Sequence, residues 1–157
     1  MKPGSVVFRW AVRVSGFLLA LAFVLAGGSK VADPAAFAEE VMRYQLVPWA
    51  GAVVVALWLP YLEILGGLGL LWRPVRAGAR LVVTVLLLTF TGVLISALRR
   101  GLNLDCGCFG RLTGPTTVTQ AFWRDFGLLA LTAFLWAPEF AGRVRRITAA
   151  EGDKEKG

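Results

Sequence analysis

The chain has 157 residues, 57% of them hydrophobic and 17% charged, a composition that is typical of membrane proteins and excludes an ordinary soluble domain. Its net charge of +7 does not indicate a nucleic-acid-binding protein, because the basic residues flank apolar segments instead of following one polar face. The sequence contains no histidine, which excludes a histidine metal site and a histidine general base.

Four apolar segments are long enough to cross the hydrocarbon core of a membrane, which takes about 20 residues of helix. They are residues 10–26, 48–72, 79–98 and 121–140. We therefore predict an all-α fold, with one four-transmembrane-helix bundle over residues 1–141 and a disordered polar tail over residues 142–157. The first segment also has features of a secretory signal peptide, but its length and the presence of Arg13 favour a helix that is retained.

The lysines and arginines predict how this bundle is oriented. Four crossings put both termini on one side of the membrane, and that side carries eleven of the 17 basic residues. The positive-inside rule then predicts cytoplasmic termini in a bacterial inner membrane, with the loop between the third and fourth segments outside the cytoplasm. Arg99 and Arg100 are exceptions, because this orientation places two adjacent basic residues on the outer side of the membrane.

A short helix is predicted in the first outer loop. Asp33 is a suitable N-cap and Pro34 suits a first helical position. Phe37, Val41 and Tyr44 follow at helical spacing on one face, so this helix is predicted to lie along the outer membrane interface. The alternative is a simple extension of the second apolar segment.

The second apolar segment contains Glu63, three residues after Pro60. A carboxylate at this depth is costly unless it is paired, protonated or turned toward other helices, and we predict Arg13 of the first segment as its partner. This pair either fixes helix register or takes part in proton or quinone handling, and the sequence leaves both roles open. Gly66, Gly67 and Gly69 are expected to let another helix approach closely.

The two cysteines of the chain form the motif Cys106-Gly107-Cys108, in the loop that is predicted to be outside the cytoplasm. A disulfide across one residue closes a small, strained ring that is easily reduced and adds little to stability, so the pair is predicted to be a redox pair. Arg124, Arg99 and Arg111 are candidates for lowering a thiol pKa, and Asp125 for holding the arginine or relaying a proton. The alternatives are inert thiols in a plain turn and, for Arg124 and Asp125, simple capping of the fourth helix.

Other polar groups of the sequence give two smaller expectations. No metal site is predicted, because there is no histidine and no third cysteine. Hydroxyl groups of the third apolar segment, Thr91 among them, are expected to bond to the backbone or across helices.

Four stretches of the sequence resemble a known family when they are taken together. They are Lys30-Val31-x-Asp33-Pro34-x-x-Phe37, Leu59-Pro60-x-x-Glu63, Arg100-Gly101-Leu102-x-x-Asp105-Cys106-Gly107-Cys108-Phe109-Gly110 and Trp123-Arg124-Asp125. Over about residues 10–140 the chain resembles the MauE branch of the DoxX-like membrane proteins. The resemblance implies a multi-pass, redox-associated inner-membrane protein. The namesake of the branch is needed for maturation of methylamine dehydrogenase, a periplasmic enzyme rich in disulfides.

The resemblance also implies roles for individual residues. Cys106 and Cys108 would be the redox pair, with Glu63, Arg124 and Asp125 at motif positions. The first functional hypothesis is a membrane thiol–disulfide redox accessory protein that serves an extracytoplasmic thiol-containing or thioredoxin-like partner, with quinone as a possible electron acceptor. The second is a non-catalytic subunit or assembly chaperone of a DoxX-like redox complex, and a weaker third is a small transporter gated by Glu63.

Overall fold

The computed structural model describes the backbone of residues 3–101 and 118–154 and the side chains of residues 6–101 and 119–137. Throughout the described backbone every regular element is a helix, which confirms the all-α prediction. The elements are α1 (Pro3–Ala32), α2 (Pro34–Arg43), α3 (Trp49–Leu71), the short 3-10 helix η1 (Arg73–Val75), α4 (Arg76–Arg99) and α5 (Val118–Lys154).

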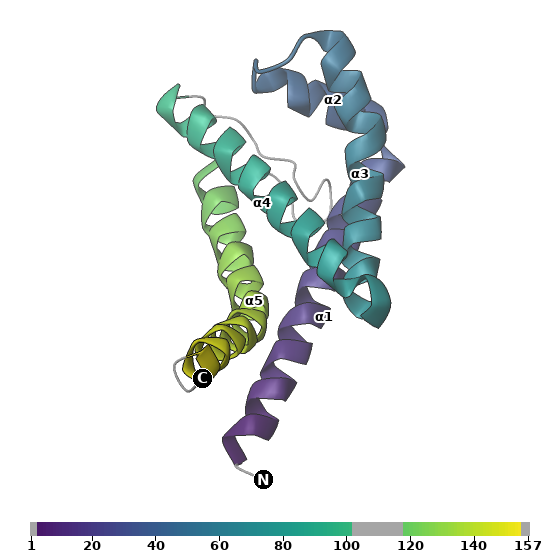
Figure 1. Cartoon of the computed structure of the whole chain (residues 1–157). Coiled ribbons are helices and arrows are strands. Elements are labelled where there is room, and N and C mark those ends of the chain that lie inside the picture. Colours follow the sequence, from purple (N-terminus) through teal and green to yellow (C-terminus); the bar gives the residue numbers. More distant parts are fainter. Residues whose placement is uncertain (1–2, 102–117, 155–157) are drawn as a thin grey trace.

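The four long helices contact one another as a closed ring. Helix α3 packs against α1 and α4, and α5 packs against α4 and α1, while the short helix α2 lies on α3. The beginning of α1 and the end of α5 lie at the same end of the bundle (Figure 1). The opposite end is formed by α2, the end of α4 and the beginning of α5.

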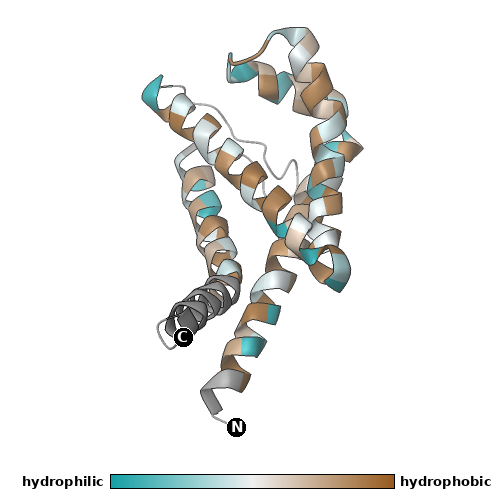
Figure 2. Ribbon diagram, viewed as in Figure 1, coloured by the Kyte–Doolittle hydropathy of each residue, from teal (hydrophilic) through white to brown (hydrophobic). Residues whose placement is uncertain are grey.

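Three of the long helices are long and apolar enough to cross a membrane. The candidate spans are Val6–Ala32, Trp49–Leu71 and Arg73–Arg99. Large apolar side chains project outward from them, such as Leu65 with 66% of its surface exposed and Leu88 with 57%. Figure 2 shows hydrophobic residues along α1, α3 and α4, with hydrophilic residues mainly toward the ends of the bundle. An outer surface of this kind is suited to lipid rather than to water.

The first three predicted segments coincide with these candidate spans. The fourth, residues 121–140, lies in α5, which is not among the spans found in the described part of the chain. The count of four crossings therefore stays a prediction. Helix α5 continues to Lys154, into the tail where the composition predicts disorder. Ala149, Ala150 and Glu151 in that stretch favour helix, which gives a local reason for the difference.

Glycines set the close contact between α1 and α3, as the sequence predicts. A Cβ atom added to Gly67 would lie 2.9 Å from the carbonyl oxygen of Ala20, and one added to Gly27 would lie 2.7 Å from that of Pro60. On the other side of α3, a Cβ on Gly69 would lie 2.8 Å from the Cβ of Ala79 in α4. These contacts show that α1 and α3 run antiparallel with their backbones close together.

Helix α2 is a separate element and not an extension of α3. The Asp33 carboxylate accepts a hydrogen bond from the backbone N–H of Ala36 at 3.1 Å, and Pro34 occupies the first turn. Phe37 packs with Ala56 of α3 in a small buried cluster. The helical structure is interrupted between Arg43 and Pro48, and Pro48 is the N-cap residue of α3. The prediction of a distinct short helix is therefore confirmed.

Candidate functional site

The loop with both cysteines lies outside the described residues, but the helix ends that hold this loop are described. Helix α4 ends at Arg99 and α5 begins at Val118. Near these ends, Leu94 and Ala97 of α4 pack with Ala121 of α5, and Tyr44 packs against the same cluster. The loop that contains Cys106 and Cys108 therefore leaves and re-enters the bundle at the end where α2 lies.

Deeper in the bundle, Glu63 of α3 forms a buried ion pair with Lys30, which lies two residues before the end of α1. The Lys30 Nζ lies 2.5 Å from the Glu63 Oε1, and only 4% of Lys30 and 1% of Glu63 are exposed. Such burial is tolerated only because each charge has an opposite charge in contact. The prediction that Glu63 is turned toward the bundle interior is confirmed.

The predicted pairing of Glu63 with Arg13 is wrong. A Cβ on Gly27 would lie 3.2 Å from the Glu63 Cβ, so these two residues are at the same level of the antiparallel pair. Arg13 precedes Gly27 by 14 residues in α1, which corresponds to about 21 Å along a helix that rises about 1.5 Å per residue. Lys30 follows Gly27 by about one helical turn and is within reach. Arg13 lies toward the other end of the bundle.

Two aromatic rings complete the surroundings of the Lys30 ammonium group. Its Nζ lies 5.0 Å from the ring centroid of Phe37 in α2 and 5.0 Å from that of Phe90 in α4. The faces of aromatic rings attract cations, and more strongly when water is excluded. The Lys30 ammonium group of α1 thus contacts side chains of α2, α3 and α4.

The buried carboxylate has hydrogen-bonding capacity left over. Within the described part of the chain, the Glu63 Oε2 is buried without a hydrogen-bond partner. A buried carboxylate oxygen in this situation can accept a hydrogen bond or hold a proton.

Outside the spans, burial raises the pKa of Glu40 in α2, and nearby Lys30 and Arg43 oppose that rise. The Lys30 ammonium group therefore interacts electrostatically with the carboxyl group of Glu40 as well as with that of Glu63.

A second buried carboxyl group, Asp125 of α5, contacts Thr91 of α4 and is only 6% exposed. The Thr91 Oγ1 is within hydrogen-bonding distance of the Asp125 Oδ2 and also lies 2.9 Å from the carbonyl oxygen of Leu87. The hydroxyl has one hydrogen and can donate to only one of these acceptors at a time. Two full hydrogen bonds can form together when the Asp125 carboxyl is protonated and donates to Thr91; otherwise the single hydroxyl hydrogen is shared between the two acceptors. The expectation that Thr91 bonds to the backbone and across helices is confirmed.

A small cavity connects these polar groups. It has a volume of about 40 Å³ and is lined by Lys30 of α1, Phe90 of α4, and Arg124 and Asp125 of α5, among others. A cavity needs about 10–15 Å³ to hold one water molecule, so this one is large enough for at least one. Of the predicted site residues, the structure brings Arg124 and Asp125 to this cavity, and Glu63 next to it through Lys30.

Lys30 is the site residue that sequence reasoning missed, because it was counted among the charges that set membrane topology. The position of Glu63 in the sequence pointed away from Lys30. In an antiparallel pair the end of the first helix lies beside the start of the second, whereas Glu63 is closer to the end of the second segment. The relative register of two antiparallel helices decides whether these residues meet, and that register is set by contacts such as those of Gly27.

Comparisons with known proteins give a consistent picture. The sequence model of the family described as "Methylamine utilisation protein MauE" matches residues 8–138 of the chain. The chain is similar to the methylamine utilization protein MauE of Paracoccus denitrificans, with 38% identity over 101 residues. That alignment covers 64% of this chain and 53% of the relative, so the chain spans about half the length of that protein. No solved structure matches significantly.

Proposed function

Since the chain belongs to the MauE family of membrane proteins, we propose that it is a thiol–disulfide redox accessory protein of the bacterial inner membrane. Its proposed role is to support disulfide formation in an extracytoplasmic thiol-containing or thioredoxin-like partner, with Cys106 and Cys108 as the redox pair. The name of the Paracoccus relative links that protein to methylamine utilisation. For this chain, the proposal concerns the disulfide chemistry and leaves the identity of the partner to experiment.

The proposed topology has four crossings, with α5 as the fourth, cytoplasmic termini and the cysteine loop outside the cytoplasm. Exposed tryptophans support it. Trp49 at the start of α3 and Trp72 just after its end are 57% and 67% exposed, and the 23 residues of α3 correspond to about 35 Å, close to the membrane thickness between two aromatic belts. Trp123 near the start of α5 is also exposed, at 65%.

The proposed reaction has two exchanges. A partner dithiol reduces the Cys106–Cys108 disulfide, so the partner gains a disulfide and this chain gains two thiols with the two electrons and two protons. A membrane quinone then accepts both electrons and both protons and becomes a quinol, which restores the Cys106–Cys108 disulfide. The chain has two cysteines, so no second disulfide of its own can act between them and the acceptor.

The observation that carries this proposal is the cavity lined by the ionisable residues Lys30, Arg124 and Asp125, the last two of which lie about two helical turns from the start of α5, where the cysteine loop ends. The second exchange moves two protons from the thiols to the quinone, and an ionisable group near the cysteine loop could carry them. Asp125 has a geometry that suits a carboxyl group able to hold a proton, and it lines a cavity with Lys30 and Arg124. We propose Asp125 as the proton relay, with Arg124 as the candidate for stabilising a thiolate.

Trapping tests the redox pair. In cells, Cys106→Ser or Cys108→Ser is expected to accumulate a mixed disulfide, because the remaining thiolate can attack the disulfide of an oxidised partner, releasing one partner thiol, and this chain has no second thiol to resolve the adduct. The adduct would be seen on non-reducing gels and would disappear after reduction. The double variant should form no adduct and should lose partner oxidation.

The non-catalytic alternative makes the opposite prediction. If the double cysteine variant oxidises or matures the partner as well as the unchanged protein does, the redox proposal fails. Loss of function in Asp125→Ala or Glu63→Ala alongside a functional double cysteine variant would then favour a membrane subunit or assembly chaperone.

Labelling tests the orientation. In intact cells treated with a reductant, a membrane-impermeant thiol reagent is expected to modify Cys106 and Cys108, with a mass shift that is absent from the double serine variant. Labelling that occurs only in inverted membrane vesicles would place the loop in the cytoplasm and contradict the proposed topology. Permeabilised cells provide the control for the total reactive thiol.

A further inference from the structure

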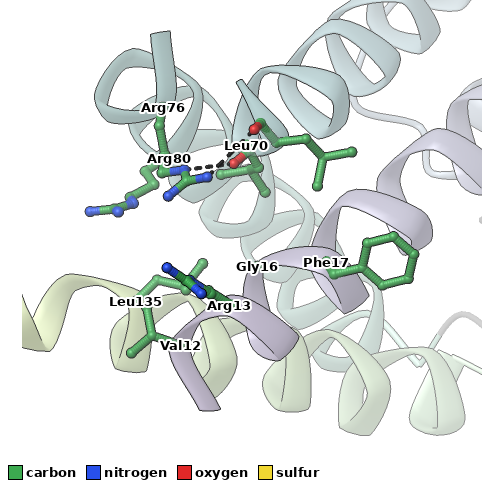
Figure 3. A pocket seen from close by; sticks show the side chains of 9 residues that line it. Val12, Arg13, Gly16, Phe17, Leu70, Arg76, Arg80 and Leu135 are labelled. Carbon is green, nitrogen blue, oxygen red and sulfur yellow. Dashed lines mark hydrogen bonds between the residues drawn. The ribbon is translucent and has the colours of Figure 1, made fainter. Parts of the chain in front are cut away.

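A second polar cavity lies toward the opposite end of the bundle, between α1, the α3–η1–α4 turn and α5. It has a volume of about 80 Å³ and is lined by three arginines, Arg13 of α1 and Arg76 and Arg80 of α4. Figure 3 shows these side chains reaching the cavity from α1 on one side and α4 on the other. No residue with a carboxylate side chain is among the described residues that line it. We call it the arginine pocket.

The arginines of this pocket are held in different ways. Arg76 donates to the carbonyl oxygens of Leu70 at 2.9 Å and Leu71 at 3.4 Å, the last residues of α3 (Figure 3). This contact satisfies carbonyl groups at the helix end and fixes the guanidinium group beside the pocket. Arg80 is 8% exposed, whereas Arg13 is exposed. The guanidinium group of Arg76 is thus positioned by the end of α3, Arg80 is buried, and Arg13 lines the pocket from α1.

We propose that the arginine pocket binds a phosphate group. Guanidinium groups form paired, charge-assisted hydrogen bonds with phosphate oxygens, and Arg13 and Arg76 reach the pocket from opposite sides. The group could come from an anionic phospholipid headgroup or from free phosphate, and both present the same oxygens to the pocket.

The rim of the pocket favours the lipid as the source. Phe17 and Leu71 line the pocket and are 57% and 47% exposed. Both belong to helices that are long and apolar enough to span a membrane. Acyl chains could lie along these side chains while the phosphate enters the pocket. Basic pockets of this kind between membrane helices are suited to lipid headgroups.

Lipid titration tests the proposal. The full chain would be reconstituted in phosphatidylcholine nanodiscs with increasing phosphatidylglycerol, and bound phosphatidylglycerol would be measured by native mass spectrometry. Arg13→Gln is expected to weaken this binding about tenfold, because it removes charge-assisted hydrogen bonds to the phosphate in the pocket. Arg9→Gln, one turn earlier in α1, and Arg73→Gln in η1 do not alter the pocket and should bind as the unchanged protein does.

A second arm uses inorganic phosphate with protein in a zwitterionic detergent, measured by thermal shift. If phosphate raises the melting temperature and Arg13→Gln abolishes this rise, free phosphate is a ligand. If phosphatidylglycerol stays bound and phosphate does not change the melting temperature, the ligand is the lipid. The proposal is overturned if neither ligand binds, or if Arg9→Gln weakens binding as much as Arg13→Gln. Equal melting temperatures of the variants in pure phosphatidylcholine confirm that folding is intact.

Discussion

Replacement of Lys30 by methionine is expected to lower the free energy of unfolding by about 3–5 kcal/mol, the range seen when one partner of a buried ion pair is removed. Glu63 is 1% exposed and would lose its opposite charge, so it would have to remain ionised in an apolar environment or take up a proton. The contacts of Lys30 with two aromatic rings would be lost as well. Thermal or denaturant unfolding in detergent micelles measures the loss.

Two further variants make this measurement interpretable. Arg9→Met removes an exposed cation from the same helix and should change stability by no more than about 0.5 kcal/mol. The double variant Lys30→Met with Glu63→Leu replaces the pair by apolar side chains and is expected to regain most of the stability. If Lys30→Met is as mild as Arg9→Met, the ion pair does not hold the bundle together.

The same double variant separates the two roles that the sequence left open for Glu63. An ion pair that only fixes helix register can be replaced by well-packed apolar residues without loss of partner oxidation. A pair that handles protons cannot, because the replacement has no ionisable group. A stable double variant that no longer supports partner oxidation would therefore assign Glu63 or Lys30 to the proton path.

Local features of the sequence predicted much of the fold. Apolar length was sufficient to find α1, α3 and α4, because each helix must satisfy its own backbone within the membrane. Asp33 and Pro34 predicted the start of α2, since an N-cap and a first-turn proline act within a few residues. The extension of α5 to Lys154 was not predicted, because composition alone does not show how far a helix continues.

The candidate site was predicted less completely, because it depends on which residues of different helices lie at the same level. Glu63 was identified from its cost in an apolar segment, but its partner was not, since Arg13 and Lys30 are both cations in the first apolar helix. Asp125 was expected beside Arg124, its neighbour in sequence, and its contact with Thr91 depends on how α4 and α5 pack. Register is a tertiary property and has no direct signal in composition.

Gly27 provides a direct test of that register. Gly27→Ala is expected to destabilise the protein by about 1–3 kcal/mol, the usual cost of excess volume in a packed interior. The added Cβ would lie 2.7 Å from both the Pro60 carbonyl oxygen and the Ile64 Cγ1, and the carbonyl belongs to the α3 backbone, which cannot rotate away. Helix α1 would have to move from α3 one turn before Lys30, which would also strain the contact of Lys30 with Glu63.

The neighbouring Gly28 is a matched control for this variant. A Cβ on Gly28 would meet no atom within 4 Å, so Gly28→Ala should be neutral or stabilise the helix by up to about 1 kcal/mol. Both variants add one methyl group to consecutive positions of α1, and they differ only in whether the group points at α3. Unfolding in the same detergent compares them directly. Equal effects of the two substitutions would show that α1 and α3 do not meet at Gly27, and the register that brings Lys30 to Glu63 would then be wrong.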